Sequence, residues 1–130
     1  MEWRKNKMQI PALEPVPLVR TELGYYCHPT FDLYWRTKFG QAEGCTADEW
    51  KDLKTYFGIE VCTLDMEHDL DESSQVYKDF FEKGGCDVSG WTPSTPKGDG
   101  WFLLSINDTE DGPIAMWARK RVGENGNNKS

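Results

Sequence analysis

Residues 98–120, with the sequence GDGWFLLSINDTEDGPIAMWARK, decide the fold that we expect for this chain of 130 residues. Two apolar runs, WFLLSIN at 101–107 and PIAMWAR at 113–119, flank the five-residue segment DTEDG, which has the length of a β-hairpin connection. Asp111 and Gly112 within it supply the left-handed backbone that such a connection needs. This stretch therefore predicts a β-hairpin.

Both faces of the predicted hairpin are largely apolar. Simple alternation along the first strand gives two sets of side chains, namely Phe102, Leu104 and Ile106 on one face and Trp101, Leu103 and Ser105 on the other. A strand that is apolar on both sides is buried on both sides. We therefore expect the hairpin at the centre of a sheet, with helices covering one side.

Further elements are predicted before the hairpin. TADEWKDLKTYFG, residues 46–58, begins with the capping-box pair Thr46 and Glu49 and ends at a glycine, as helices often do. SSQVYKDFFEKGG, residues 73–85, has paired apolar positions and two terminal glycines, which predict a second helix. FDLYWR, residues 31–36, can form a strand or a short helix, and its aromatic spacing favours the helix. IEVCTLDM, residues 59–66, is rich in β-branched residues and predicts a strand.

Together these patterns predict one α+β domain at residues 20–122, because a chain of this length forms one domain. The predicted antiparallel sheet holds the hairpin and residues 59–65, and two or more helices pack against it. Residues 1–19 contain three prolines and predict an extended arm. Residues 123–130 predict a disordered tail.

The formal charge of −7 is distributed unevenly along the chain. Residues 1–20 carry +2 and residues 119–130 carry +3, which leaves −12 for residues 21–118. Such an acidic body repels phosphate, which argues against direct binding of nucleic acid or of an anionic membrane. It suits a protein partner with a basic surface, although a surface that only keeps the protein in solution gives the same pattern.

The sequence lacks the usual signatures of a membrane segment, a secretion signal or a cofactor site. It has no long apolar run, and we expect a cytoplasmic protein whose four cysteines are thiols. The loop that starts at Asn107 resembles the start of a calcium loop, but Ala118 stands where the glutamate ligand is required. No paired cysteine motif for zinc and no nucleotide or hydrolase motif is present. We therefore expect neither a cofactor nor enzymatic activity.

Residues 87–120, DVSGWTPSTPKGDGWFLLSINDTEDGPIAMWARK, resemble the C-terminal part of small proteins encoded by tailed phages and prophages, which share a GDGWFLLSIxDTEDGP pattern. GYYCHP, residues 24–29, is similar to an early G-Y-x-x-H-P segment of that family. Asn107 stands where many relatives have histidine, so any chemistry of that histidine is lost here. The family has no assigned activity. The resemblance therefore implies an accessory protein of phage or prophage origin in a bacterial cell.

We predict from charge and resemblance a small acidic, non-enzymatic protein that binds a host protein with a basic surface, such as a nucleic-acid-binding or defence complex, and inhibits it. The predicted contacts are Asp65, Glu67, Asp69, Asp71, Glu72, Asp108, Glu110, Asp111 and Trp91. Two alternatives stay open. One is a metal-binding or enzymatic protein that uses His28, His68 and the cysteines, and the other is a self-associating structural phage protein. The sequence does not define the oligomeric state.

Overall fold

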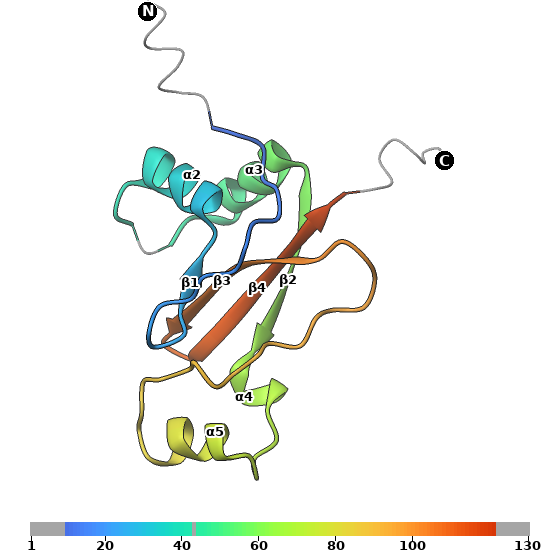
Figure 1. The fold of residues 1–130 in the computed structure, drawn as a ribbon. Helices are drawn as coiled ribbons and strands as arrows, with labels where there is room; N and C mark the ends of the chain where they lie inside the picture. The colour runs from blue at the N-terminus through green and yellow to red at the C-terminus, as the bar shows by residue number, and fades with distance from the viewer. Residues whose placement is uncertain (1–9, 43, 122–130) are drawn as a thin grey trace, which may run out of the picture.

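The computed structural model describes residues 10–42 and 44–121 and contains one four-stranded antiparallel sheet. The strands are β1 (Tyr26–Cys27), β2 (Ile59–Asp65), β3 (Phe102–Thr109) and β4 (Gly112–Lys120), in the spatial order β1-β3-β4-β2 (Figure 1). The hairpin β3–β4 thus occupies the centre, and the strand predicted at residues 59–65 pairs with β4, as expected. With its helices the sheet forms an α+β domain, which confirms the predicted fold class.

Two helices, α2 (Pro29–Phe39) and α3 (Ala47–Phe57), lie together over one end of the sheet (Figure 1). In the predicted capping box of α3, Thr46 Oγ1 accepts from Glu49 N at 3.1 Å, and Glu49 Oε1 accepts from Thr46 N at 2.9 Å. Gly58 ends α3 with a φ of 66°, a conformation that side chains disfavour. The helix predicted at residues 46–58 is therefore confirmed, and so is the one favoured at residues 31–36.

The remaining helical turns lie at the other end of the sheet. They are α4 (Met66–Asp69), α5 (Gln75–Tyr77) and the π-helical turn η1 (Lys78–Glu82). The helix predicted at residues 73–85 is therefore correct in place, but it widens after one α-helical turn. The wide turn lets the adjacent Phe80 and Phe81, whose ring centroids are 5.0 Å apart, both pack against the core of the domain.

The connection between β3 and β4 is shorter than the sequence suggests. Thr109 pairs with Gly112, so only Glu110 and Asp111 lie in the turn, in place of the five residues predicted. The side chain of Thr109 replaces part of the missing loop, because its Oγ1 accepts from Asp111 N at 3.1 Å and donates to Gly112 O at 2.6 Å. Of the predicted pair Asp111 and Gly112, the glycine takes the positive φ, of 108°, and Asp111 does not.

A β-bulge interrupts β3, and it corrects the predicted alternation of side chains. Leu103 pairs with Trp117 but Ser105 pairs with Met116, so Leu104 is an additional residue on β3. Beyond the bulge the faces are exchanged. Leu104 packs under α2 and α3, whereas Ile106 packs on the opposite face of the sheet. The prediction that these two residues share a face was therefore wrong.

Two apolar clusters pack on opposite faces of the sheet. The first joins α2 and α3 to the sheet and includes Leu13, which is fully buried although residues 10–19 form neither helix nor strand. The second is centred on Trp91, Met66 and Ile106 and is covered by α4, η1 and the loop that precedes β3. Each face of the central hairpin is thus buried at a different end of the sheet.

Candidate functional site

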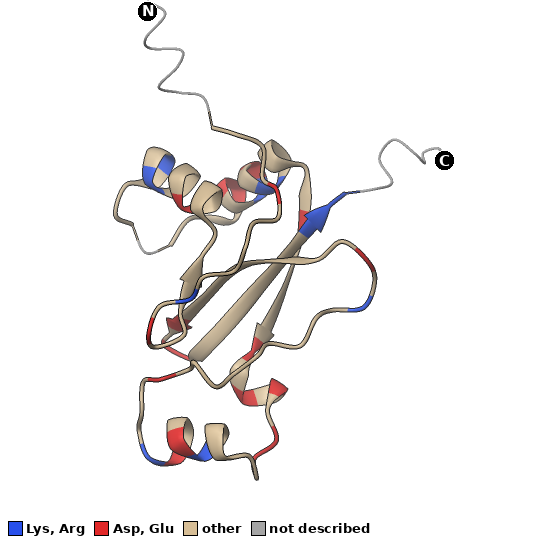
Figure 2. Ribbon diagram, viewed as in Figure 1, with Lys and Arg blue, Asp and Glu red and all other residues tan. Residues whose placement is uncertain are grey.

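The sheet register brings the two predicted acidic segments to the same end of the molecule. Asp65 and Asn107 both lie opposite Ile114, on either side of β4, so the end of β2 is two strand spacings, roughly 10 Å, from that point of β3. Figure 2 shows acidic residues gathered there and on the helical turns that follow β2. Seven of the predicted contacts are exposed, and we call them the acidic end: Asp65, Glu67, Asp71, Glu72, Asp108, Glu110 and Asp111.

Few basic groups neutralise the acidic end. Within the described part of the chain, neither lysine nor arginine lies within 4.0 Å of these seven carboxylates, and the one histidine that contacts them is His68, whose Nδ1 lies 3.0 Å from Asp65 Oδ2. The backbone N–H of Ser73 donates to Asp71 and lowers the pKa of that exposed carboxyl group. The acidic end therefore produces a concentrated negative potential, which a basic surface on a partner protein can neutralise.

The basic residues at the end of β4 lie at the opposite end of the sheet (Figure 2). Arg119 donates to Glu60 Oε2 at 2.8 Å, and its guanidinium lies 4.4 Å from the centroid of the Trp101 ring. The length of β4, nine residues, separates the two ends by roughly 27 Å. Because this separation exceeds the screening length at physiological salt, the two ends act as separate surfaces.

Two of the predicted contacts serve the core instead of the surface. Trp91 is fully buried, and its indole N–H donates to Asp69 Oδ2 at 2.9 Å, while Ser94 N donates to the same oxygen at 3.1 Å. Partial burial alone would raise the pKa of Asp69, but these hydrogen bonds outweigh it and lower the pKa. The prediction of Trp91 as an exposed contact was therefore wrong, because a carboxylate lets its polar edge be buried.

His28 and His68 do not form a joint site. His28 is 1% exposed, its Nδ1 accepts from Thr30 N at 3.1 Å, and its Nε2 donates to Glu14 O at 2.6 Å. Both ring nitrogens are therefore engaged, and they fix the start of α2 against the preceding segment. His68 lies on α4, beyond the opposite edge strand. Among residues 10–42 and 44–121, no three potential metal ligands come together.

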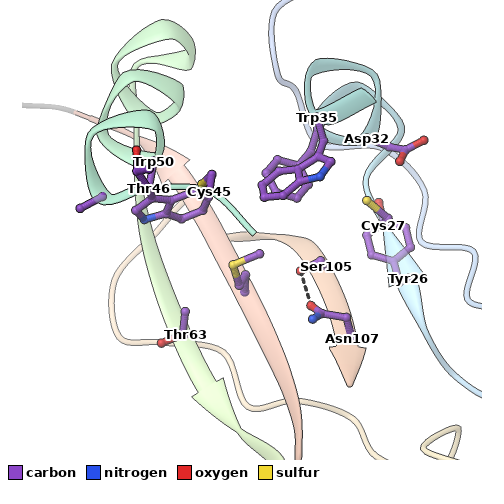
Figure 3. Close-up of a pocket in the computed structure, with 13 residues that line it drawn as sticks. Tyr26, Cys27, Asp32, Trp35, Cys45, Thr46, Trp50, Thr63, Ser105 and Asn107 are labelled. Carbon is purple, nitrogen blue, oxygen red and sulfur yellow. Dashed lines mark hydrogen bonds between the residues drawn. The ribbon is translucent and has the colours of Figure 1, made fainter. Parts of the chain in front are cut away.

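A cleft of about 630 Å³ opens between the sheet and the N-terminal parts of α2 and α3 (Figure 3). We call it the aromatic cleft. Its lining comes from β1, both helices, the segment between them and three sheet strands, and consists of Tyr26, Cys27, Phe31, Asp32, Trp35, Cys45, Thr46, Ala47, Trp50, Thr63, Ser105, Asn107 and Met116. Clefts of this size are typical of small-molecule sites.

Three aromatic rings form the helical wall of the aromatic cleft. Phe31 stands between the two tryptophans, with its centroid 6.1 Å from that of Trp35 and 6.5 Å from that of Trp50. Trp35 is held in place because its indole N–H donates to Ala42 O at 2.8 Å. Phe31 is buried, whereas both tryptophans are half-buried. The tryptophans therefore present apolar ring surface to the open cleft.

The sheet side of the aromatic cleft carries a polar pair. Ser105 Oγ donates to Asn107 Oδ1 at 3.1 Å, and both side chains face the cleft because the bulge shifts them to this side (Figure 3). Cys27 lies opposite Ser105 on β1. Burial raises the pKa of the Cys27 thiol to about 11, and the nearby Asp32 carboxylate adds to this shift. The thiol is therefore neutral at physiological pH and a poor nucleophile.

From the sequence, Asn107 stands out as the first residue of a calcium-like loop and as a departure from the phage pattern, and neither feature predicts the cleft. Protein-family models, curated proteins and solved structures were compared with this chain, and none of them matches. In the part of the chain that the structure describes, no helix has the length and apolar character to cross a lipid bilayer.

Proposed function

We propose that this chain is a small, non-enzymatic binding protein whose acidic end docks on a basic surface of a partner protein. The observation that carries the proposal is the convergence of two acidic segments, far apart in the sequence, at one end of the sheet. The seven exposed carboxylates have neither lysine nor arginine as a partner among the described residues, so they repel each other, and a basic partner protein would relieve that repulsion.

The resemblance to phage and prophage proteins supports a bacterial host protein as the partner. Basic surfaces that bind phosphate backbones are found on nucleic-acid-binding and defence complexes. An acidic end that occupies such a surface would exclude nucleic acid from it, and the protein would act as an inhibitor in the bacterial cytoplasm. Direct binding to nucleic acid or to an anionic membrane is disfavoured by the same charges.

The test compares two variants that have the same net charge. The first reverses the hairpin turn with D108K, E110K and D111K. The second reverses three exposed carboxylates outside the acidic end with E22K, D52K and D99K, so each variant raises the formal charge of −7 by the same amount. Proteins captured from a bacterial lysate by the wild-type chain are identified, and their affinity is measured for all three forms at low and high salt.

The proposal predicts that the turn variant loses affinity by about tenfold or more and shows a weaker salt dependence, while the matched variant binds like the wild type. Equal losses in both variants would show that only the net charge matters. Unchanged affinity in the turn variant would remove the acidic end as the contact. Either result overturns the proposal.

A further inference from the structure

We propose that the aromatic cleft binds a neutral, planar heteroaromatic molecule with a lactam edge, that is, adjacent ring N–H and C=O groups, as in the nucleobases uracil and hypoxanthine. This inference concerns a different surface from the acidic end and does not depend on the proposed function. It stands on the three rings of the helical wall, the polar pair on the sheet, and the charges around the cleft.

The helical wall fits a flat ring. Trp35 and Trp50 flank Phe31, and both are half-buried, so a planar molecule entering the cleft finds aromatic surface to stack on. Because the indole N–H of Trp35 is engaged by Ala42 O, that ring is oriented before a ligand arrives. Stacking on a fixed aromatic ring loses little conformational entropy, which favours binding.

The polar pair fits the edge of such a ring. Asn107 accepts from Ser105 through Oδ1, and among the described residues its Nδ2 has no hydrogen-bond partner. A carboxamide group matches a lactam edge, because Nδ2–H can donate to the ligand C=O while Oδ1 accepts from the ligand N–H. Since the bulge directs Ser105 into the cleft next to Asn107, the pair is held by the sheet rather than by a mobile loop.

The charges around the cleft disfavour anionic ligands. Among the described residues that line it, neither lysine nor arginine is present, and Asp32 carries the one formal charge. Asp32 is itself paired with the exposed Arg36, at 3.0 Å. Cys27 stays neutral because its pKa is about 11. The lining thus offers a phosphate group no cation, in a protein of net negative charge, so we expect the base or nucleoside and not the nucleotide.

The experiment is a titration of the full chain, labelled with ¹⁵N, with uridine and inosine. The matched ligands are 3-methyluridine and 1-methylinosine, in which a methyl group replaces the lactam hydrogen, and the 5′-monophosphates of the two parent nucleosides. Uridine or inosine should shift the amide signals of Thr63, Ser105, Asn107 and Met116. The methylated and phosphorylated forms should bind about tenfold more weakly.

Two variants with matched controls locate the contact. N107A should weaken binding by about tenfold and W50L by more, because base–aromatic stacking contributes that order of affinity. The controls are Q75A, another exposed amide, and W101L, a tryptophan that stacks on Arg119 outside the cleft, and both should bind like the wild type. Since Asn107 is exposed, N107A remains informative even if W50L does not fold. Absence of binding at millimolar concentration, equal binding of the methylated ligands, or unchanged affinity of N107A would overturn the proposal.

Discussion

Both faces of the sheet carry tryptophan side chains, but the two faces bury them to different degrees. On the face covered by α4 and η1, Trp91 is fully buried and its N–H is bound by Asp69. On the other face, Trp35 and Trp50 stay half-buried around the aromatic cleft, because α2 and α3 cover only one end of the sheet. Trp91 thus differs from Trp35 and Trp50 in that a segment with a polar partner closes over it.

Among the tests of this difference, we expect Trp91→Ala to have the largest effect on stability. Removing a fully buried indole should lower the free energy of unfolding by about 3–5 kcal/mol, because the loop and α4 cannot close the cavity completely. Trp50→Ala removes a half-buried ring and should cost less than about 2 kcal/mol. Urea unfolding followed by circular dichroism measures both values. Equal losses would mean that the two faces are equally packed.

Asp69 should be the next most sensitive position. Asp69→Ala leaves the buried indole N–H of Trp91 without its acceptor and should cost about 1–3 kcal/mol in unfolding free energy. The exposed carboxylate of Asp99 supplies the control, and Asp99→Ala should have little effect. A wild-type stability for Asp69→Ala would show that Trp91 does not need this hydrogen bond.

The stability of the protein in acid should also depend on Asp69. The pKa of this carboxyl group is lowered in the folded protein, so the stabilisation it gives is complete above the ordinary carboxyl pKa, about 4. It is lost as the pH falls through the lowered pKa. Asp69→Asn should therefore show a smaller loss of stability between neutral pH and about pH 3 than the wild type, in urea unfolding over that range. An equal decline in the stability of the wild type and of Asp69→Asn would show that Asp69 does not contribute to the acid sensitivity.

A smaller effect is expected at the start of α3. Thr46→Ala removes the cap that accepts from Glu49 N and should cost about 1 kcal/mol. Thr55→Ala, at an exposed position within the same helix, is the control and should change stability little. Because Thr46 also lines the aromatic cleft, the first turn of α3 links the stability of the helix to the position of Trp50. Thermal unfolding distinguishes the two variants, and the same melting temperature for both would argue against the capping role.

The smallest effect is expected at Asn107. Its side chain is exposed, but its Oδ1 accepts from the hydroxyl group of the buried Ser105, so Asn107→Ala should lower the unfolding free energy by about 0.5–1 kcal/mol, the net contribution of one hydrogen bond. Such a result would show that the open face tolerates loss of its polar pair, as expected of a binding surface. A loss of several kcal/mol, measured by urea unfolding, would instead make Asn107 a structural residue.

Features that local sequence encodes were predictable. The capping box of α3, the β-branched run of β2 and the central place of the hairpin follow from residues that are neighbours along the chain. Burial of Trp91 was not predictable, because it depends on Asp69, which is 22 residues away and was itself expected on the surface. A Gly/Pro-rich loop around a tryptophan has the same composition whether it folds over the core or projects into solvent.

The aromatic cleft could not be predicted for a related reason. Its walls come from segments that are distant in sequence, and no one of them has a recognisable motif. The sequence also gives no sign of the bulge at Leu104, because the run WFLLSIN has the pattern of an uninterrupted strand in either register. The clearest signal in hindsight was Ser105, a polar residue inside an apolar run, whose hydroxyl group needed a partner.

The bulge makes Leu104 an insertion in β3 that a substitution cannot remove. It interrupts the alternation of side chains along β3, so odd-numbered residues face one side of the sheet before Leu104 and the other side after it. Deletion of Leu104 would restore a regular alternation of side chains along the whole strand. Phe102 and Leu103 would keep the faces that they have now, and so would Ser105, Ile106 and Asn107, because their partners on β4 already alternate without interruption. The bulge thus adds Leu104 to the core under the helices and leaves the cleft in place.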